Sequence, residues 1–392
     1  MKRVLYLSSW QLFKESKIEI PFIYEQIGVL SKDVRATYVE PIFYNFKTWL
    51  KLYYKNDWVI KKPSPWKDDA IQVDYFQIYL PKISTRITNN SLIDDLFYAS
   101  YFLSKQIQKK IGKVDIIHLN AILPLGGFAV GWYRRLNTPF ILHEHSAPFE
   151  MHLDNKHKRR WVVEILDKAS RIVAVGSGLL KRIQDTNPRV LNKMVVIPNM
   201  IRTDLFQVSD NNLGDTVNLI SVGGLVERKG YDLLLNAVSA LIDQKYKVQL
   251  CIVGEGESRL RLEEMIHKLN LGKIVTLTGY LNKKEINSLF HKSNIYVHTS
   301  YRETFGIAPT EAMLKGRPVV STICEGPEYY INKENGVLVE TGNAVAVAEG
   351  IKFVIKNFEK YNVHKIRSTV VDLFGEKKFL KSMIQVYEGV KK

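Results

Sequence analysis

The segment IYVHTSYRETFGIAPTEAMLKGRPVVST, residues 295–322, contains the alternation of strand and helix from which the fold can be predicted. Its two ends are short apolar runs with the β-branched composition of buried parallel strands. Between them, Pro309 suits the start of a helix and Gly316 suits its end. The pattern predicts a strand, a loop, a helix beginning at Pro309 and a second strand, which is the βαβ unit of a parallel sheet.

The same alternation extends through both halves of the chain and predicts two doubly wound, Rossmann-like α/β domains. Because 392 residues exceed one ordinary core, we expect domains at residues 1–200 and 201–375, joined near the polar, turn-rich segment 199–215. A helical stripe of apolar residues follows at 376–392. The expected strands are RVLYL, VDIIHL, TPFILHEH, RIVAVGS and KMVVIPN in the first half, and VNLISVGG, VQLCIVGEG, IVTLTGY, IYVHTS, RPVVST and GVLVE in the second.

The composition, 46% hydrophobic and 24% charged, is that of a soluble globular enzyme. Cys251 and Cys324 have neither CxxC spacing nor clustered histidines, so the pattern predicts no disulfide framework and no zinc site. The apolar run that follows Lys2 and Arg3 is too short for a signal peptide, and no apolar stretch is long enough to span a membrane. We therefore expect a protein of the reducing cytoplasm.

The net charge of +16 is unevenly spread. Residues 1–205 contain 31 Lys+Arg and 19 Asp+Glu, a net +12, whereas residues 206–392 contain 25 and 21, a net +4. The basic first half predicts an anionic partner, which charge alone leaves open between nucleic acid, an acidic membrane surface and a phosphorylated substrate. Residues 43–69 interleave aromatic side chains with lysines, which suits a membrane interface and equally suits a helix that packs its aromatics on its own domain.

Two adjacent cations follow the first expected strand of the second half. Arg228 and Lys229 precede Gly230, which enters an amphipathic helix. Ligands of open α/β sheets bind beyond the carboxyl ends of the strands, near helix N-termini. The planar fork of an arginine and the point charge of a lysine would both suit a diphosphate there, although such a pair is also common in solvated turns.

Glu303 and Glu311 stand eight positions apart across the expected loop and helix. Two carboxylates can be the acid and base of glycoside hydrolysis, or each can accept hydrogen bonds from hydroxyls of a sugar-containing ligand. A helix that begins at Pro309 would place Glu311 in its first turn, where the dipole favours the ionised carboxylate. The pattern therefore favours hydroxyl recognition.

Together these motifs resemble the nucleotide-sugar domain of retaining glycosyltransferases of family four, the group 1 glycosyltransferases, whose fold is GT-B. The span from Glu303 to Glu311 matches that family's E-x7-E motif. The resemblance implies two Rossmann-like domains facing a cleft, with the helix of residues 376–392 crossing back onto the first. It continues through VIPNMIRTDLF, SVGGLVERKGYDLLLNAV, CIVGEGESRL, LTGYLNKKEINSLFHKSN, EGPEYYI and NGVLVE.

The resemblance also implies roles for individual residues. Arg228 and Lys229 would hold the donor diphosphate, Glu303 would bind hydroxyls of the donor sugar, and Glu311 would bind the ribose. Where many members have Gly-Arg-Leu, this chain has Gly223-Gly224-Leu225, so one cation of the family is absent. The remaining donor-side candidates are Gly223, Tyr280, Leu281 and the backbone amides of Phe305, Gly306 and Ile307.

In the first half, His145 stands where the family has its active-site histidine after a strand. A histidine at a strand end is by default buried and structural, and we interpret His143 in that way. His118 and Asn120 are the acceptor-side candidates. Residues 8–26 depart from the family, since many members have a glycine-rich turn there.

The predicted function is retaining transfer of a sugar from a nucleoside diphosphate, UDP rather than GDP, to a glycan or lipid-linked acceptor in polysaccharide or glycoconjugate biosynthesis. His145, Glu303, Arg228 and Lys229 are the predicted catalytic residues. Because the chain has no DxD motif, we expect neither a metal nor a cofactor. We expect a cytoplasmic protein, peripheral on the inner face of the cell membrane.

Two alternatives compete with this prediction. A nucleotide-sugar epimerase or hydrolase on the same fold would convert the donor with no acceptor present. A non-catalytic nucleic-acid binder is suggested by the charge of +16 alone, but the chain has no recognisable RNA or DNA module, so we expect no nucleic-acid partner.

Overall fold

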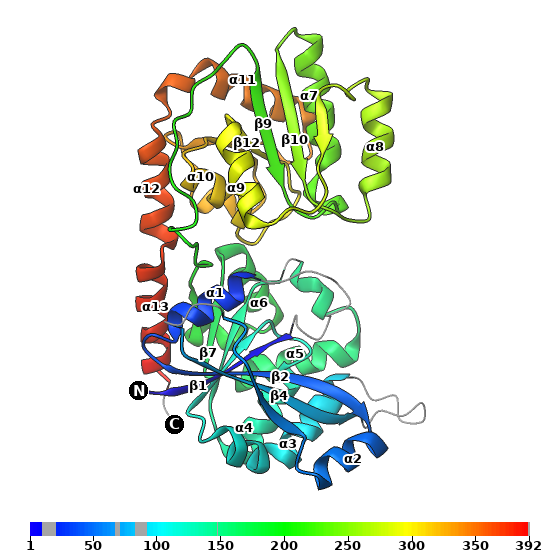
Figure 1. The fold of residues 1–392 in the computed structure, drawn as a ribbon, viewed down its shortest axis with the longest axis vertical. Helices are drawn as coiled ribbons and strands as arrows, with labels where there is room; N and C mark the ends of the chain where they lie inside the picture. Colours follow the sequence, from blue (N-terminus) through cyan, green and yellow to red (C-terminus); the bar gives the residue numbers. More distant parts are fainter. Residues whose placement is uncertain (10–20, 67–70, 83–91, 147, 391–392) are drawn as a thin grey trace. The chain divides into compact units, whose positions relative to one another are not determined.

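The computed structural model describes residues 1–9, 21–66, 71–82, 92–146 and 148–390. The chain forms two compact units (Figure 1). The first comprises Met1–Pro198 and Phe379–Lys392, and the second comprises Asn199–Lys378. Residues 10–20 and 67–70, which belong to the sequence features noted above at 8–26 and 43–69, lie outside the described residues.

The first unit is built on a sheet that, in the described residues, has eight strands in the order β3-β4-β2-β1-β5-β6-β7-β8. All neighbours pair in parallel except β3, which is antiparallel to β4. The strands are β1 (Arg3–Ser8), β2 (Arg35–Asn45), β3 (Val59–Lys62), β4 (Val73–Lys82), β5 (Ile116–Asn120), β6 (Phe140–Glu144), β7 (Arg171–Ala174) and β8 (Met194–Val196). The central strands β1, β5 and β6 are buried, as the short apolar runs predicted.

Helices lie on both faces of this sheet (Figure 1). They are α1 (Pro21–Leu30), α2 (Phe46–Tyr54), α3 (Leu92–Ile111), α4 (Gly126–Leu136), α5 (Lys156–Lys168), α6 (Ser177–Thr186) and α13 (Glu376–Glu388), with short 3₁₀ helices at Phe149–His152 and Pro188–Lys193. Phe379, Met383 and Tyr387 of α13 are buried, each 3% exposed or less, so the apolar stripe of the last helix packs within the first unit.

The second unit is a parallel sheet with the order β11-β10-β9-β12-β13-β14 in the described residues. The strands are β9 (Val217–Val222), β10 (Val248–Val253), β11 (Val275–Leu277), β12 (Ile295–His298), β13 (Val319–Thr322) and β14 (Gly336–Val339). The helices are α7 (Tyr231–Asp243), α8 (Arg259–Lys268), α9 (Lys283–Lys292), α10 (Ile307–Leu314), α11 (Ala344–Lys356) and α12 (Val363–Phe374), with 3₁₀ helices at Glu227–Lys229, Pro327–Tyr329 and Phe358–Lys360. The doubly wound fold predicted from strand and helix alternation is confirmed, and every expected strand is present.

The prediction for the start of the helix after β12 was wrong. Helix α10 begins at Ile307, so Pro309 is its third residue and Glu311 lies in its second turn. Proline is tolerated there because the first N–H groups of a helix have no intrahelical acceptor. Glu311 is therefore further from the positive end of the helix than the sequence suggested.

The aromatic segment 43–69 divides into buried and exposed parts. Trp49 of α2 and Trp58 are buried, 8% and 3% exposed, and the Trp49 indole N–H donates to Tyr79 O at 3.0 Å. Phe46 and Tyr54 of α2 are 55% and 79% exposed. Trp49 and Trp58 therefore pack on their own domain, whereas a membrane role for the exposed rings stays a prediction.

Candidate active site

The loop with the two cations is held against the chain that follows β12. Gly230 has a φ of +62°, and a Cβ there would lie 2.2 Å from the carbonyl oxygen of Thr299. Only glycine accommodates both this backbone conformation and this approach. The Thr299 hydroxyl donates to Lys229 O at 3.1 Å, and Tyr301 N–H donates to Arg228 O at 2.8 Å. These contacts place Arg228 and Lys229 beside the loop that contains Glu303.

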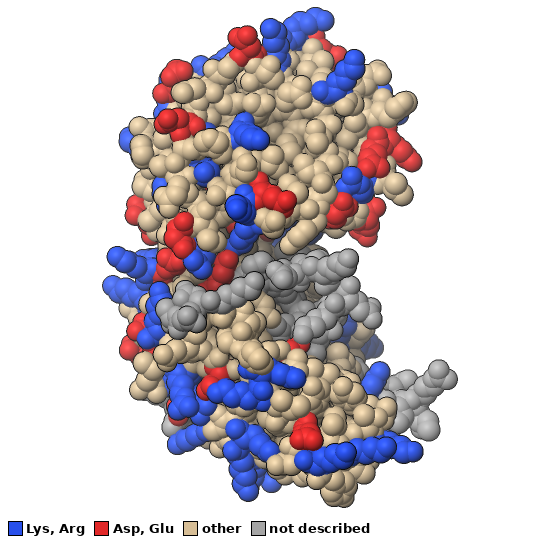
Figure 2. Space-filling model, in the orientation of Figure 1, with Lys and Arg blue, Asp and Glu red and all other residues tan. Residues whose placement is uncertain are grey.

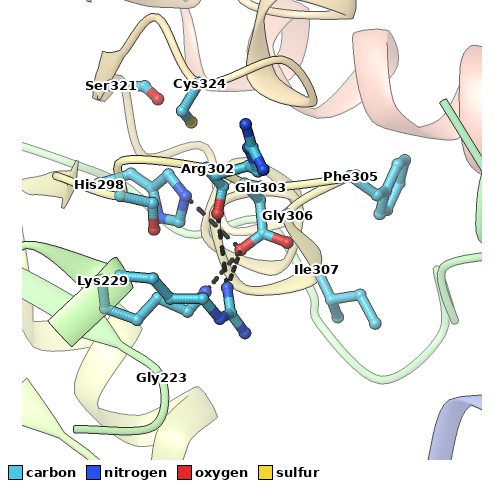
Figure 3. A network of polar contacts seen from close by, with 12 residues as sticks. Gly223, Lys229, His298, Arg302, Glu303, Phe305, Gly306, Ile307, Ser321 and Cys324 are labelled. Carbon is cyan, nitrogen blue, oxygen red and sulfur yellow. Dashed lines mark hydrogen bonds and ion pairs between the residues drawn. The ribbon is translucent and has the colours of Figure 1, made fainter. Parts of the chain in front are cut away.

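Glu303 is fixed by its backbone and surrounded by cationic or imidazole nitrogens. Its N–H donates to Cys324 O and its carbonyl accepts from Gly326 N–H, both at 2.8 Å. Lys229 Nζ lies 2.5 Å from Glu303 Oε2, and Arg228 Nη1 and His298 Nε2 each lie 3.9 Å from the same oxygen. Figure 3 shows Lys229 and His298 directed at the Glu303 carboxylate. Glu303, which is predicted to bind the donor sugar, thus forms one cluster with Arg228 and Lys229, which are predicted to bind the diphosphate.

The cluster keeps Glu303 ionised and His298 neutral. Burial by itself raises the pKa of Glu303, but the charge of Lys229, with further contributions from His298 and Arg228, outweighs it and lowers the pKa to about 2. Burial is also the main cause that lowers the pKa of His298 to about 3, and the charge of Lys229 adds to it. His298 Nε2 is buried and has no hydrogen-bond partner among the described residues.

The sequence interpretation did not include His298. It is the last residue of β12, a position at which ligands of α/β sheets are bound, and that position was the available signal.

Gly306 forms the entry to α10 beside Glu303. It is the N-cap residue with a φ of +90°, and a Cβ would lie 2.7 Å from the Tyr330 hydroxyl. That hydroxyl donates to Phe305 O at 3.1 Å. The Phe305 side chain points away from Glu303 (Figure 3) and packs on Phe374 with ring centroids 4.8 Å apart. The start of the helix, where free N–H groups and the positive end of the dipole favour an anion, therefore lies next to the Glu303 side chain.

Glu311 lies buried in α10, 8% exposed. Its Oε1 lies 3.9 Å from the Nζ of Lys283, the first residue of α9. The positive charge near Glu311 therefore comes from Lys283, whereas the sequence had suggested that it comes from the N-terminus of the helix. Tyr280 and Leu281 lie in the loop just before Lys283, and the Tyr280 ring is 67% exposed.

Gly223 lies at the end of β9, close to Lys229. Its N–H donates to Val253 O at 2.9 Å and its carbonyl accepts from the Tyr231 hydroxyl at 3.0 Å. A Cβ on Gly223 would lie 3.4 Å from Lys229 Cε. Contacts therefore connect one group of donor-side candidates, which comprises Gly223, Arg228, Lys229, Glu303 and the start of α10. The second group is Glu311 with Lys283, and Tyr280 and Leu281 precede Lys283 in the chain.

The candidate residues of the first unit form a buried layer at the ends of β5 and β6. His118 Nε2 lies 3.3 Å from His143 Nδ1, and the rings of His143 and His145 have centroids 4.0 Å apart. His145 Nε2 lies 3.3 Å from Asn120 Oδ1. His118 and Asn120 are only 1% and 2% exposed, so these acceptor-side candidates lie beneath the surface and next to His145.

Glu144 fixes the backbone of this layer and was missed by the sequence interpretation. Its buried carboxylate accepts hydrogen bonds from the N–H groups of Ile122 at 2.7 Å, His145 at 2.9 Å and Ser146 at 2.8 Å. A charged residue between two histidines at a strand end was the only signal in the sequence. The carboxylate holds the turn that presents His145.

Two family models match this chain. The model described as glycosyl transferases group 1 matches residues 203–368, and the model described as Glycosyltransferase Family 4 matches residues 64–205. The chain belongs to the group 1 glycosyltransferases. In this glycosyltransferase, the Family 4 match ends at residue 205 and the group 1 match begins at residue 203, close to the boundary between the two units at Pro198 and Asn199.

Known proteins agree with this assignment. An uncharacterized glycosyltransferase of Methanocaldococcus jannaschii is 29% identical over 66% of this chain and 70% of its own length. CapM of Staphylococcus aureus, a capsular polysaccharide biosynthesis glycosyltransferase, is 27% identical over 48% of this chain and 53% of its own. The structure of HepE from Anabaena in complex with UDP has a TM-score of 0.73 and 18% identity, and the match covers 100% of both chains. The fold of this glycosyltransferase is GT-B.

No helix within the described ranges is both long and apolar enough to cross a membrane.

Proposed function

We propose that this glycosyltransferase transfers a sugar from a UDP-sugar to a glycan acceptor with retention of the anomeric configuration. The observation that carries the proposal is the buried pair of Lys229 and Glu303, 2.5 Å apart beside the start of α10. One partner suits a diphosphate and the other suits sugar hydroxyls, so the pair has the two chemistries that a nucleotide sugar presents.

In this mechanism, donor binding exchanges the partners of the pair. The diphosphate attracts Lys229 and Arg228, whose side chains are already beside the α10 N-terminus, and the carboxylate of Glu303 is released to accept sugar hydroxyls. His298 Nε2, 3.9 Å from that carboxylate and without a partner among the described residues, donates a hydrogen bond to it in place of Lys229. The buried carboxylate therefore keeps a partner throughout.

The bond between the anomeric carbon and the diphosphate oxygen then breaks, and its electron pair stays on the diphosphate. The acceptor oxygen bonds to the same face of that carbon, and its proton passes to a departing phosphate oxygen. Arg228, Lys229 and the α10 amides stabilise the charge that develops on the leaving group, which is the main catalytic effect we propose. His145 acts on the donor sugar during transfer, as the family motif implies.

The nucleoside is proposed to bind at the second group of residues. Glu311 accepts hydrogen bonds from the ribose hydroxyls, and the exposed Tyr280 ring offers an apolar face to the base. The UDP complex of HepE supports uridine as the base. Neither a metal nor a cofactor is required in this proposal, since lysine, arginine and helix amides supply the positive charge.

The acceptor is proposed to be a lipid-linked glycan at an anionic membrane surface, in glycan biosynthesis as for CapM. Support comes from what we call the α2–α3 face. In Figure 2, Lys and Arg outnumber the acids over the lower part of the first unit, where α2 and α3 lie in Figure 1. Exposed aromatic rings with lysines between them suit a headgroup region. The face comprises exposed Phe46, Lys47, Lys51 and Tyr54 of α2 and its C-cap residue Lys55, with Tyr98, Phe102, Lys105 and Lys109 of α3.

A donor screen tests the proposal. The full chain would be incubated with UDP-, GDP- and ADP-sugars, first for binding and then with lipid-linked and free glycan acceptors, and the anomeric configuration of the product would be read by NMR. We expect tightest binding of a UDP-sugar and a product with the donor's configuration. Inversion would contradict the mechanism, and full-rate conversion of donor without acceptor would show a hydrolase or epimerase instead.

A further inference from the structure

A continuous layer of polar side chains lies on one face of the first sheet. The strand register pairs Tyr6 with His118 and Asn120 with His143, and side chains two residues apart on a strand share a face. Most residues on the central strands of this sheet are apolar, so polar groups at these positions need partners. Several of these polar side chains are hydrogen-bond partners of one another, and a further partner comes from the last helix, α13.

Tyr387 of α13 connects this layer to the end of the chain. Its hydroxyl lies 2.6 Å from His118 Nδ1 and 3.1 Å from the Tyr6 hydroxyl. On the far side of the ring, His118 Nε2 lies 3.3 Å from His143 Nδ1. The ring of His143 then lies against that of His145, with centroids 4.0 Å apart. A chain of adjacent groups thus leads from the C-terminal helix to the predicted catalytic histidine.

The hydroxyl of Tyr387 has one proton to donate, and where it goes determines the tautomers of two rings. If it goes to His118 Nδ1, His118 is protonated on Nε2 and donates to His143 Nδ1. If it goes to Tyr6, His118 donates from Nδ1 and accepts at Nε2 from His143 Nδ1–H. In either direction a single hydroxyl places the proton on both histidines, and no mixed arrangement keeps all the hydrogen bonds.

Both rings are neutral, which makes the position of the proton decisive. Burial lowers the pKa of His118 to about 3 and that of His143 well below its ordinary value, and a charge on His145 lowers both further. His143 Nε2 is buried and has no hydrogen-bond partner within the described part of the chain. The orientation of the His143 ring is therefore fixed by the Nδ1 contact and by packing against the rings of His145 and Phe379. The centroid of the Phe379 ring lies 6.3 Å from that of His143, with an angle of 23° between the ring planes.

The orientation of His145 itself is determined on its other side. Asn120 Nδ2 donates to Leu7 O at 3.4 Å, which turns Asn120 Oδ1 towards His145 Nε2. An amide oxygen only accepts, so His145 is protonated on Nε2. His145 is thus held between Asn120 and the ring of His143.

We propose that Tyr387 is a positioning residue for His145, acting through the hydrogen bond to His118 and the packed ring of His143, so that the C-terminal helix helps to hold the histidine used in transfer in place. The inference rests on the role of His145 proposed above. Lys2 Nζ, which donates to Tyr387 O at 2.5 Å, anchors the turn of α13 that presents the hydroxyl. His118 is on this basis a support for His145 and has no direct contact with the acceptor.

The test is Tyr387→Phe, which removes one oxygen and keeps the ring. Tautomers of the histidines would be assigned in ¹⁵N-labelled full-length protein by long-range ¹H–¹⁵N NMR. We expect the His118 and His143 signals to change from one tautomer to a mixture and those of His145 to shift. Turnover should fall about tenfold, as for one lost hydrogen bond to a functional group, while UDP affinity stays within about twofold.

The matched control is Val386→Ala, which removes two buried methyl groups from the same turn of α13 and no polar atom. It should leave the tautomers and turnover unchanged. Unchanged tautomers in Tyr387→Phe would overturn the inference, and so would altered tautomers with unchanged turnover. Failure of the proposed function is separate, because it would appear as full activity of His145→Ala whatever the tautomers show.

Discussion

The candidate residues of the two units occupy corresponding places in two doubly wound sheets, but their chemistry differs. In the second unit, a buried carboxylate is compensated by a lysine 2.5 Å away. In the first unit, a layer of neutral imidazoles is linked by hydrogen bonds and covered by α13. Glu144, the carboxylate in that layer, accepts from backbone amides at the turn.

This difference shows how one fold can bury polar groups in two ways. In an ion pair, an anionic ligand can replace the carboxylate as the partner of the lysine. In a hydrogen-bonded imidazole layer, the position of each ring proton is fixed by its neighbours. The first suits binding of a diphosphate, and the second suits precise orientation of one histidine. Substitution and pH should therefore affect the two units differently.

The largest effect is expected from Lys229→Ala, which leaves the Glu303 carboxylate buried without its nearest cation. Unfolding free energy should fall by about 3 kcal/mol, and transfer should fall at least about 100-fold. Denaturant unfolding and turnover measure these changes. In the double variant Lys229→Ala, Glu303→Gln most of the stability should return without the activity, and exposed Lys292→Ala is the control. Intact turnover in Lys229→Ala would refute the assignment.

Next in size is the contrast between the two glutamates of the E-x7-E motif. Glu303→Gln should lower transfer about 100-fold with UDP affinity nearly unchanged, because its carboxylate is proposed to contact the sugar. Glu311→Gln should weaken UDP binding about tenfold and change turnover little, as for a hydrogen bond to ribose. Calorimetric titration with UDP and steady-state kinetics separate these effects. Equal losses of transfer and of UDP affinity in both variants would contradict the assignment of Glu303 to the sugar and Glu311 to the ribose.

The response to acid should distinguish the buried imidazoles from the Glu303 carboxylate. His118 and His298 have native pKa values of about 3, so below their ordinary value of 6.5 the unfolded chain binds protons that the native protein does not. Stability is therefore lost as pH falls from 6.5 towards 3. Glu303, with a native pKa of about 2, adds a further loss only below its ordinary value of 4.5.

This expectation is measured by unfolding free energy against pH. His118→Gln should reduce the slope between pH 6.5 and 4.5 by about one proton, or about 1.4 kcal/mol per pH unit. Glu303→Gln should alter the slope only below pH 4.5. Identical profiles for both variants would break the contrast between imidazole layer and ion pair.

The smallest effect on turnover is expected at the α2–α3 face. Replacing Lys47, Lys51 and Lys55 with glutamine should reduce sedimentation with vesicles that contain anionic lipid at least about tenfold, since each lysine near such a surface contributes about 1 kcal/mol. Turnover with a soluble acceptor should not change. The control is glutamine at three exposed lysines of the second unit, Lys284, Lys292 and Lys333. Vesicle binding that does not depend on anionic lipid would contradict the proposed role of the α2–α3 face.

The strands and the order of elements could be predicted because short apolar runs and helical stripes record burial locally. Strands β2, β3 and β4 were missed, since β2 includes Pro41 and a glutamate and β3 contains two lysines. These strands lie towards one edge of the sheet, where polar residues are tolerated. The start of α10 was misplaced because proline fits any position of the first turn.

The sequence by itself determined the two α/β units, the E-x7-E motif and the pair Arg228–Lys229, since each is a pattern of neighbouring residues. Only the tertiary structure decided which side chains meet. His298 faces Glu303 across the loop that joins β12 to α10, Lys283 meets Glu311 from another helix, and Tyr387 reaches His118 from the end of the chain. Such contacts depend on strand order and helix packing, which bring together residues whose separation in sequence carries no local signal.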